Sequence, residues 1–154
     1  MQEKLNLRQE FIKKRRIQIW YKALAHTAAL TGFQGLTLHE IYEKYPVLQQ
    51  NSIKAIKEGK FKGMKVPSIL LEVQNVEQVG QCYQIRCVDI LGGDYDSSSI
   101  DCTFHSDCKP KMQKEVRKGC ILHLENVAVY CLGMQPNKSN LIVMDKCIKK
   151  IVKL

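Results

Sequence analysis

The stretch from Val66 to the C-terminus constrains the fold most, because its apolar residues recur at every second position in several separate runs. Alternation with a period of two, bounded by glycine and polar residues, is typical of half-buried β-strands. We predict strands over residues 66–76, 83–90, 99–104, 121–130 and 141–152, with a polar helical segment between the third and the fourth. The candidate core residues of these strands are Ile69, Leu71, Val73, Ile85, Phe104, Ile121, Leu124, Val127 and Ile142.

The order of these elements predicts the fold class. Five strands with one helix inserted between the third and the fourth is the order of an oligonucleotide/oligosaccharide-binding (OB) barrel. We therefore predict a mainly β, α+β chain in which residues 48–154 form a five-stranded OB-fold barrel with a capping helix. Residues 1–47 are predicted to form a basic helical extension, and 154 residues suffice for one domain with such an appendage.

The positive charge is concentrated before the barrel. Residues 1–65 hold 13 Lys/Arg and 5 Asp/Glu, a net charge of +8, whereas residues 66–154 carry a net charge of +1. Such asymmetry indicates an anionic partner for the basic part, most often nucleic acid or an acidic protein.

A helix is predicted from about Leu5 to Leu30, ending at Thr31-Gly32, because this stretch has no proline or glycine. Its basic residues are phosphate contacts, a solvated face, or a nuclear address. A second basic set lies along the inserted helix and its exit. The candidate nucleic-acid contacts are Lys13, Lys14, Arg15, Arg16, Lys22, Lys109, Lys111, Lys114, Arg117 and Lys118.

The same helix carries apolar residues on more than one face, so one neighbour cannot cover them all. Short helices are predicted over 38–45, with a Thr37–Glu40 capping box, and over 49–58. Either these helices close a self-contained bundle, or a partner chain covers the remaining face. The candidate partner contacts are Phe11, Ile12, Ile17, Ile19, Trp20 and Leu24.

The spacing of cysteine and histidine residues bears on whether the chain holds a metal or a catalytic site. The seven cysteines include no Cys-x-x-Cys pair. The spacing of Cys102-x-x-His105-x-x-Cys108 resembles that of zinc ligands, but we expect these residues to be reduced and structural. The sequence has no phosphate loop, dinucleotide fingerprint or nucleophile elbow. We expect a non-enzymatic protein without a cofactor or bound metal.

Residues 48–154 resemble the N-terminal OB domain of the large subunit of replication protein A. The motifs that carry the resemblance are Leu48-x-x-x-Ser52-Ile53-x-x-Ile56-x-x-Gly59, Val66-Pro67-Ser68-Ile69-Leu70, Val73-x-Asn75-Val76, Tyr83-x-Ile85, Gly119-Cys120-Ile121-Leu122-His123-Leu124 and Leu141-Ile142-Val143-Met144. The resemblance implies a protein-recruitment module with a weaker affinity for DNA. Small OB subunits of this kind occur in replication, telomerase and DNA-modifying complexes.

Two functions are compatible with these features. The first is an accessory subunit of a nuclear DNA-processing complex (replication, telomere maintenance or DNA modification) that docks partner proteins and contacts single- or double-stranded DNA without base preference. The second is a purely structural adaptor without DNA contact, for example in a DNA adenine methyltransferase or telomerase assembly. No apolar run approaches the length of a membrane span, so we expect no membrane partner and a soluble, nuclear location.

Overall fold

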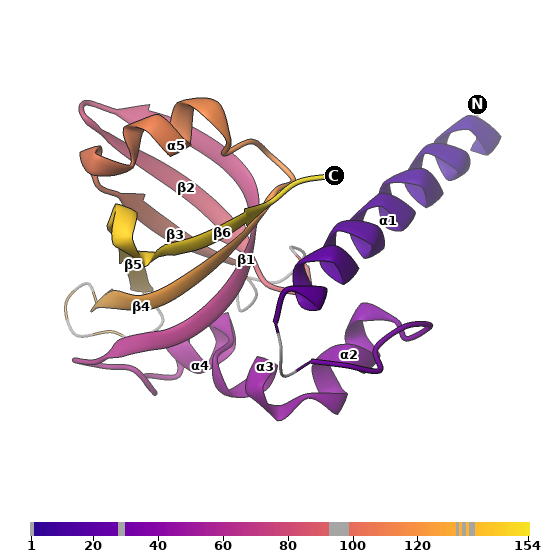
Figure 1. Cartoon of the computed structure of the whole chain (residues 1–154), viewed down its shortest axis with the longest axis horizontal. Coiled ribbons are helices and arrows are strands. Elements are labelled where there is room, and N and C mark those ends of the chain that lie inside the picture. The colour runs from indigo at the N-terminus through magenta and orange to yellow at the C-terminus, as the bar shows by residue number, and fades with distance from the viewer. Residues whose placement is uncertain (1, 28–29, 93–98, 132, 134, 136–137) are drawn as a thin grey trace.

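The computed structural model describes residues 2–27, 30–92, 99–131, 133, 135 and 138–154. Figure 1 shows strands wrapped into one barrel, short helices beneath it, and a long N-terminal helix that projects away from it. The helices are α1 (Gln2–Ala25), α2 (Leu38–Lys44), α3 (Pro46–Gln50), α4 (Ile53–Lys57) and α5 (Lys109–Lys114). The strands are β1 (Lys65–Val79), β2 (Cys82–Val88), β3 (Ser99–Phe104), β4 (Ile121–Cys131), β5 (Ser139–Val143) and β6 (Ile148–Val152). Within the described ranges, no helix combines the length and apolar character that crossing a membrane requires.

The barrel closes through the long first strand. β1 pairs with β4 along its first half and with β2 along its second half, both antiparallel. β2 pairs with β3, β3 pairs in parallel with β5, and β5 pairs with β4 to complete the circuit. This closed five-stranded arrangement, with α5 between β3 and β4, is the OB fold, and it confirms the predicted fold class.

The predicted last strand, residues 141–152, is interrupted. β5 and β6 both pair antiparallel with β4, at opposite halves of that strand, and the 3-10 turn Asp145–Cys147 separates them. One prediction within this strand is wrong: Ile142 is only partly buried, because the register of β5 turns Leu141 and Val143 into the barrel instead. The other eight candidate core residues are buried.

Two helix boundaries also differ from prediction. α1 ends at Ala25 rather than near Leu30, which is instead a buried residue beside Phe33 in the core beneath α1. The predicted helix over 49–58 is two helices, α3 and α4. Pro46 begins α3, where its missing N–H costs nothing, and Ser52 caps α4 by accepting a hydrogen bond from the N–H of Ala55 (3.1 Å).

Two apolar cores organise the chain. The first fills the barrel and includes Ile53 and Ile56 of α4, which close its lower end. The second joins the C-terminal half of α1 and residues 30–41 to the outside of the barrel at Ile90, Ile121 and Val152. α1 is therefore docked on the barrel by the segment from Arg16 to its C-terminal end, while most of its N-terminal half is exposed. The division into residues 1–47 and 48–154 stays a prediction.

Candidate functional site

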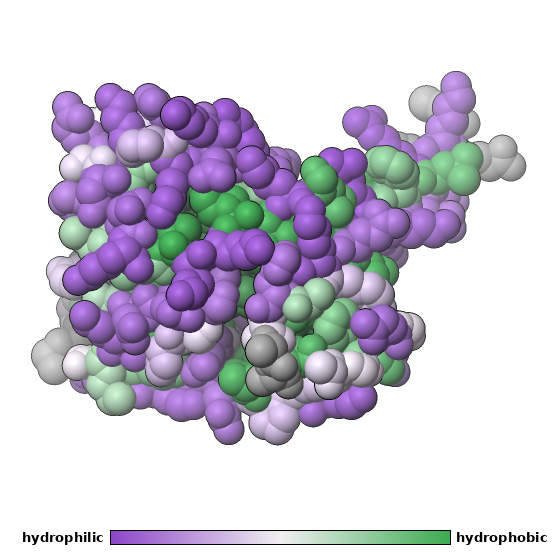
Figure 2. Space-filling view, viewed as in Figure 1, coloured by the Kyte–Doolittle hydropathy of each residue, from purple (hydrophilic) through white to green (hydrophobic). Residues whose placement is uncertain are grey.

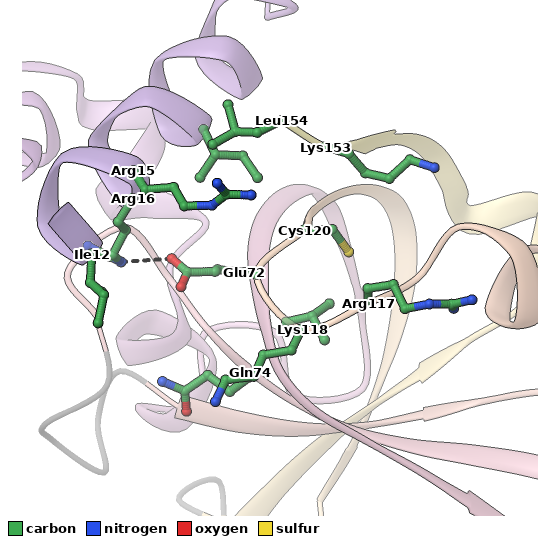
Figure 3. A pocket seen from close by; sticks show the side chains of 13 residues that line it. Ile12, Arg15, Arg16, Glu72, Gln74, Arg117, Lys118, Cys120, Lys153 and Leu154 are labelled. Atoms are coloured by element: carbon green, nitrogen blue, oxygen red, sulfur yellow. Dashed lines mark hydrogen bonds and ion pairs between the residues drawn. The ribbon is translucent and has the colours of Figure 1, made fainter. Parts of the chain in front are cut away.

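A groove of about 520 Å³ lies where α1 meets the barrel (Figure 3). One wall is α1. The other is built from the middle of β1, the turn that precedes β4, and the C-terminal residues. The lining residues are Ile12, Arg15, Arg16, Ile19, Glu72, Val73, Gln74, Arg117, Lys118, Gly119, Cys120, Lys153 and Leu154.

The groove combines an apolar floor with basic walls. Ile19, Val73 and Cys120 are buried and supply the floor. Arg15 is exposed on the α1 side, and Lys118 and Lys153 are exposed on the barrel side. Cations on facing walls concentrate positive potential in a cleft, so an extended anion is the ligand that this geometry favours.

A β-bulge shapes the floor. The pairing of β1 with β2 slips between Val73 and Asn75, which leaves Gln74 without a cross-strand partner. Val73 is still opposite Cys87 of β2, and its backbone also bonds to the turn before β4: its N–H donates to the carbonyl of Cys120 (2.9 Å) and its carbonyl accepts from the N–H of Gly119 (2.8 Å). A bulge redirects side chains from the regular alternation, and here it brings Gln74 to the groove (Figure 3).

Arg16 holds α1 to the barrel rather than offering a free charge. Its Nε donates to Glu72 Oε1 (2.8 Å), and its Nη2 donates to the carbonyls of Asp89 (3.0 Å) and Ile90 (3.1 Å). The same Glu72 oxygen accepts from Trp20 Nε1 (2.7 Å). Arg16 therefore uses its Nε and Nη2 donors within the chain, and its contact with phosphate stays a prediction.

Beside this network lies an acidic group with a shifted pKa. Burial raises the pKa of Asp89 to about 6, although hydrogen bonds from the N–H groups of Leu91 and Ile53 and the charge of Arg16 act in the opposite direction. The Asp89 carboxyl and the carbonyl that Arg16 contacts belong to the same residue. A change in the charge of Asp89 therefore acts at the junction between α1 and the barrel.

The two predicted basic sets converge on the groove in part. Arg15 from the first set faces Lys118 from the second across it, and these are the strongest remaining phosphate-contact candidates. Lys13 and Lys14 are exposed on α1 outside the groove. Lys22 donates to the carbonyl of Lys153, which ties the helix to the C-terminal residues.

The α5 residues are distributed differently. Lys109 and Lys114 are exposed outside the groove, and Lys111 forms an ion pair with Asp145 (3.0 Å). Arg117 lines the groove, but its guanidinium donates to the carbonyls of Gln113 (2.6 Å) and Val116 (2.8 Å) at the end of α5. Its charge remains near the groove while its donors cap the helix.

Lys153 is a basic residue of the groove that was not among the predicted nucleic-acid contacts. It follows the last strand with no motif around it, and only the pairing of β6 with β4 carries it to the wall opposite α1. The clue available in the sequence was its basic character near the end of a predicted strand, which is too common to mark a site.

Three of the six predicted partner contacts are instead part of the chain's own core. Trp20 (1% exposed), Ile19 and Leu24 pack against the barrel and residues 30–41. The prediction that they meet a partner is wrong, because the docking of α1 uses them, and Ile17 packs partly against the same core. Phe11 and Ile12 remain exposed, the latter at the rim of the groove.

The face of an OB barrel that most often stacks bases has few exposed aromatic side chains in this chain. Tyr83 and Phe104 are buried in the barrel core, and Tyr130 is 55% exposed. Tyr95 lies outside the described residues. Arg86 pairs across β2 and β3 with Asp101, so neighbouring charges on this face offset one another. Within the described residues, this face of β2 and β3 therefore offers no exposed aromatic platform with an unbalanced positive charge beside it.

The three residues of the Cys102-x-x-His105-x-x-Cys108 motif differ in burial. Cys102 and Cys108 are buried, and burial raises the pKa of the Cys108 thiol to about 12, with a further contribution from its hydrogen bond to Asp107. His105 is exposed, and its Nδ1 accepts a hydrogen bond from the N–H of Asp107 (3.1 Å). Across the described ranges, no group of three or more potential ligands is arranged to hold a metal ion.

No model of a known protein family matches this sequence, and no curated protein sequence matches it. Among solved structures, the chain is similar to Schizosaccharomyces pombe Pot1pC, crystallised bound to single-stranded DNA (CGGTTACGGT). The identity is 12%, the TM-score is 0.44, and the similarity covers 59% of this chain and 79% of that one. The resemblance to the replication protein A domain stays a prediction.

Proposed function

We propose that this chain is a non-catalytic OB-fold accessory subunit that binds nucleic-acid phosphates through the groove beside α1. The observation that supports the proposal is the convergence of Arg15, Lys118 and Lys153, from three distant parts of the sequence, on one groove. Cations that contact phosphates carry no base information, so the binding is independent of sequence. The sequence resemblance supports the further proposal that the chain acts in a nuclear DNA-processing complex.

The nearest candidate for a catalytic pair lies outside the groove, in a small separate pocket lined by Ser68 and His123. Ser68 Oγ lies 2.9 Å from His123 Nε2, which is the nearest approach to a nucleophile–base pair among the described contacts. Glu125 approaches that same ring nitrogen, at 3.9 Å. A catalytic relay needs the carboxylate on the other ring nitrogen, so this arrangement does not activate the serine.

The test is the salt dependence of binding to single- and double-stranded DNA. Replacing Arg15, Lys118 and Lys153 together with alanine removes three phosphate contacts and should flatten the slope of log K against log salt by about 2–3 units. The matched control replaces Lys54, Lys62 and Lys65, three exposed lysines outside the groove, with alanine. Equal slopes for the two triple variants would refute the groove as the binding site.

The alternative function, a structural adaptor without DNA contact, is favoured by the exposed apolar residues on the free half of α1, where Leu7 is 66% and Phe11 63% exposed. It predicts that the chain alone binds neither form of DNA, even at low salt. Both functions hold if one helix serves a nucleic acid on one side and a protein on the other.

A further inference from the structure

The free half of α1 carries a second ordered surface. Lys4, Leu7, Phe11, Lys14 and Gln18 follow one another at spacings of three, four, three and four residues. This is the repeat by which one face of a helix meets a second helix in a coiled coil. The side chains of all five are exposed. We call these five residues the outer stripe.

The outer stripe is on the opposite side of α1 from the barrel. At about 3.6 residues per turn, it lies roughly half a turn away from Trp20 and Ala23, which face the core beneath the helix. The groove residues Ile12 and Arg15 lie between the two faces. A chain bound along the outer stripe therefore leaves the core contacts of α1 intact.

The N-terminal half of α1 has few contacts with the rest of the chain, which favours its burial against a partner. The outer stripe runs about 21 Å along α1 from residue 4 to residue 18, and Figures 1 and 2 show the N-terminal end of the helix standing clear of the barrel with apolar and polar residues interspersed. Helical segments of this length are marginal in water without tertiary packing. Leu7 and Phe11 are large apolar side chains that are mostly exposed to water, and a partner that covers them would gain hydrophobic stabilisation.

Charge decides which partner fits. α1 holds seven Lys/Arg and two Glu, a net charge of +5. A second copy would place Lys4 and Lys14 opposite identical lysines at core positions, which disfavours self-pairing. A nucleic acid would neutralise the lysines but leave Leu7 and Phe11 uncovered. The complementary surface is a helix with two apolar residues flanked by acidic ones.

We propose that the outer stripe docks an acidic amphipathic helix of a partner protein, with Leu7 and Phe11 as the apolar contacts and Lys4 and Lys14 as the charged ones. The proposal deepens the proposed function, since it rests on the chain being a subunit and specifies the chemistry of its protein partner. The partner motif is Glu-x-x-Leu-x-x-x-Leu-x-x-Glu. Its spacing is identical in both directions, so it fits a parallel or an antiparallel helix.

The probe is a synthetic helical peptide with this motif and alanine and glutamine elsewhere, and the comparison peptide has lysine in place of glutamate. The full chain should bind the acidic peptide at least about tenfold more tightly than the basic one at low salt. Replacing Leu7 and Phe11 with alanine should weaken acidic-peptide binding by about tenfold or more. Both positions are exposed and alanine favours helix, so these variants keep the fold.

Adjacent lysines provide the matched control. Lys14→Glu lies on the outer stripe and should weaken binding of the acidic peptide, whereas Lys13→Glu makes the same charge change about a quarter turn away and should not. Equal effects would overturn the proposal, as would Leu7→Ala/Phe11→Ala binding like the parent. Sedimentation that shows a dimer lost in that double variant would assign the stripe to a second copy.

Nucleic-acid binding is measured on the same variants. Leu7→Ala/Phe11→Ala should leave DNA affinity unchanged, because neither residue lines the groove. If this variant lost DNA binding, the outer stripe would be a nucleic-acid surface and the docking proposal would fail. If instead the triple groove variant kept its salt slope, the proposed function would fail while the peptide result stood.

Discussion

Glu72→Ala is the substitution that most directly tests how α1 is held on the barrel. One carboxylate oxygen of Glu72 accepts hydrogen bonds from both Arg16 Nε and Trp20 Nε1, two residues of the same helix. Its removal leaves the indole N–H of a residue that is 1% exposed without its acceptor. Arg16 keeps its hydrogen bonds to the carbonyls of Asp89 and Ile90, so it loses only part of its contacts with the barrel.

The magnitude follows from these contacts. An unsatisfied buried N–H costs about 1–3 kcal/mol. The ion pair, whose side chains are 25% and 15% exposed, adds about 1 kcal/mol after allowance for solvent screening. We expect Glu72→Ala to lower the free energy of unfolding by about 2–4 kcal/mol. Glu72→Gln, which keeps an acceptor for Trp20 but loses the charge, should cost less than half as much.

The assay uses an internal reporter. Trp20 is the single tryptophan of the chain, so its fluorescence follows the docking of α1. Urea unfolding of the parent and of both variants, followed by fluorescence and by circular dichroism, gives the two free-energy differences. If the unfolding free energy of Glu72→Ala stayed within about 0.5 kcal/mol of the parent, with unshifted Trp20 emission, the network would not be what holds α1.

Three further predictions concern stability. Because the pKa of Asp89 is raised from 3.8 to about 6, the folded state holds this proton more tightly than the unfolded state; the resulting stabilisation is complete below pH 3.8 and is lost as pH rises through 6. Asp89→Asn should therefore gain up to about 3 kcal/mol on the parent between pH 4 and pH 8 in parallel urea titrations, and a constant difference would contradict the shift. Phe104→Ala should cost about 3–5 kcal/mol, because that ring is fully buried in the barrel core, and a parent-like urea midpoint would refute its burial. Thr37→Ala should cost about 1 kcal/mol by thermal or urea unfolding, since the hydroxyl accepts from the N–H of Glu40; no loss would mean that the capping box is dispensable.

The barrel was predictable because period-two alternation is local in sequence. β3 coincides with its predicted range, and β1, β2 and β4 differ from theirs by a few residues at their ends. The interruption before β6 was not predictable, because Asp145 and Lys146 fit an exposed strand position as well as a turn. The turn is needed because β5 and β6 pair with opposite halves of β4, and the chain must pass from one half to the other.

The candidate site was predictable in residue type and not in arrangement. The sequence identified Arg15 and Lys118 as basic candidates, but it placed them on separate surfaces about a hundred residues apart. It also assigned Arg16 to phosphate and Trp20 to a partner. Both are used inside the chain because Glu72, a residue that alternation marks only as outward-facing, is the acceptor that they share. Pairing across such distances is decided by the closure of the barrel.

The groove exists only while α1 is docked, and this gives a prediction whose sign separates two explanations of binding. By charge alone, removing the Glu72 carboxylate from a phosphate-binding groove should tighten DNA binding, by up to about fivefold for a partly exposed group. If the docked helix is needed to place Arg15 opposite Lys118 and Lys153, Glu72→Ala should instead weaken binding by about tenfold and flatten the salt slope by about one contact. Glu77→Ala is the matched control, because it removes an exposed acid from the same strand outside the groove. Tighter binding by both variants would mean that the basic residues act independently of the helix, and weaker binding by Glu72→Ala alone would show that the Arg16–Glu72–Trp20 network builds the site.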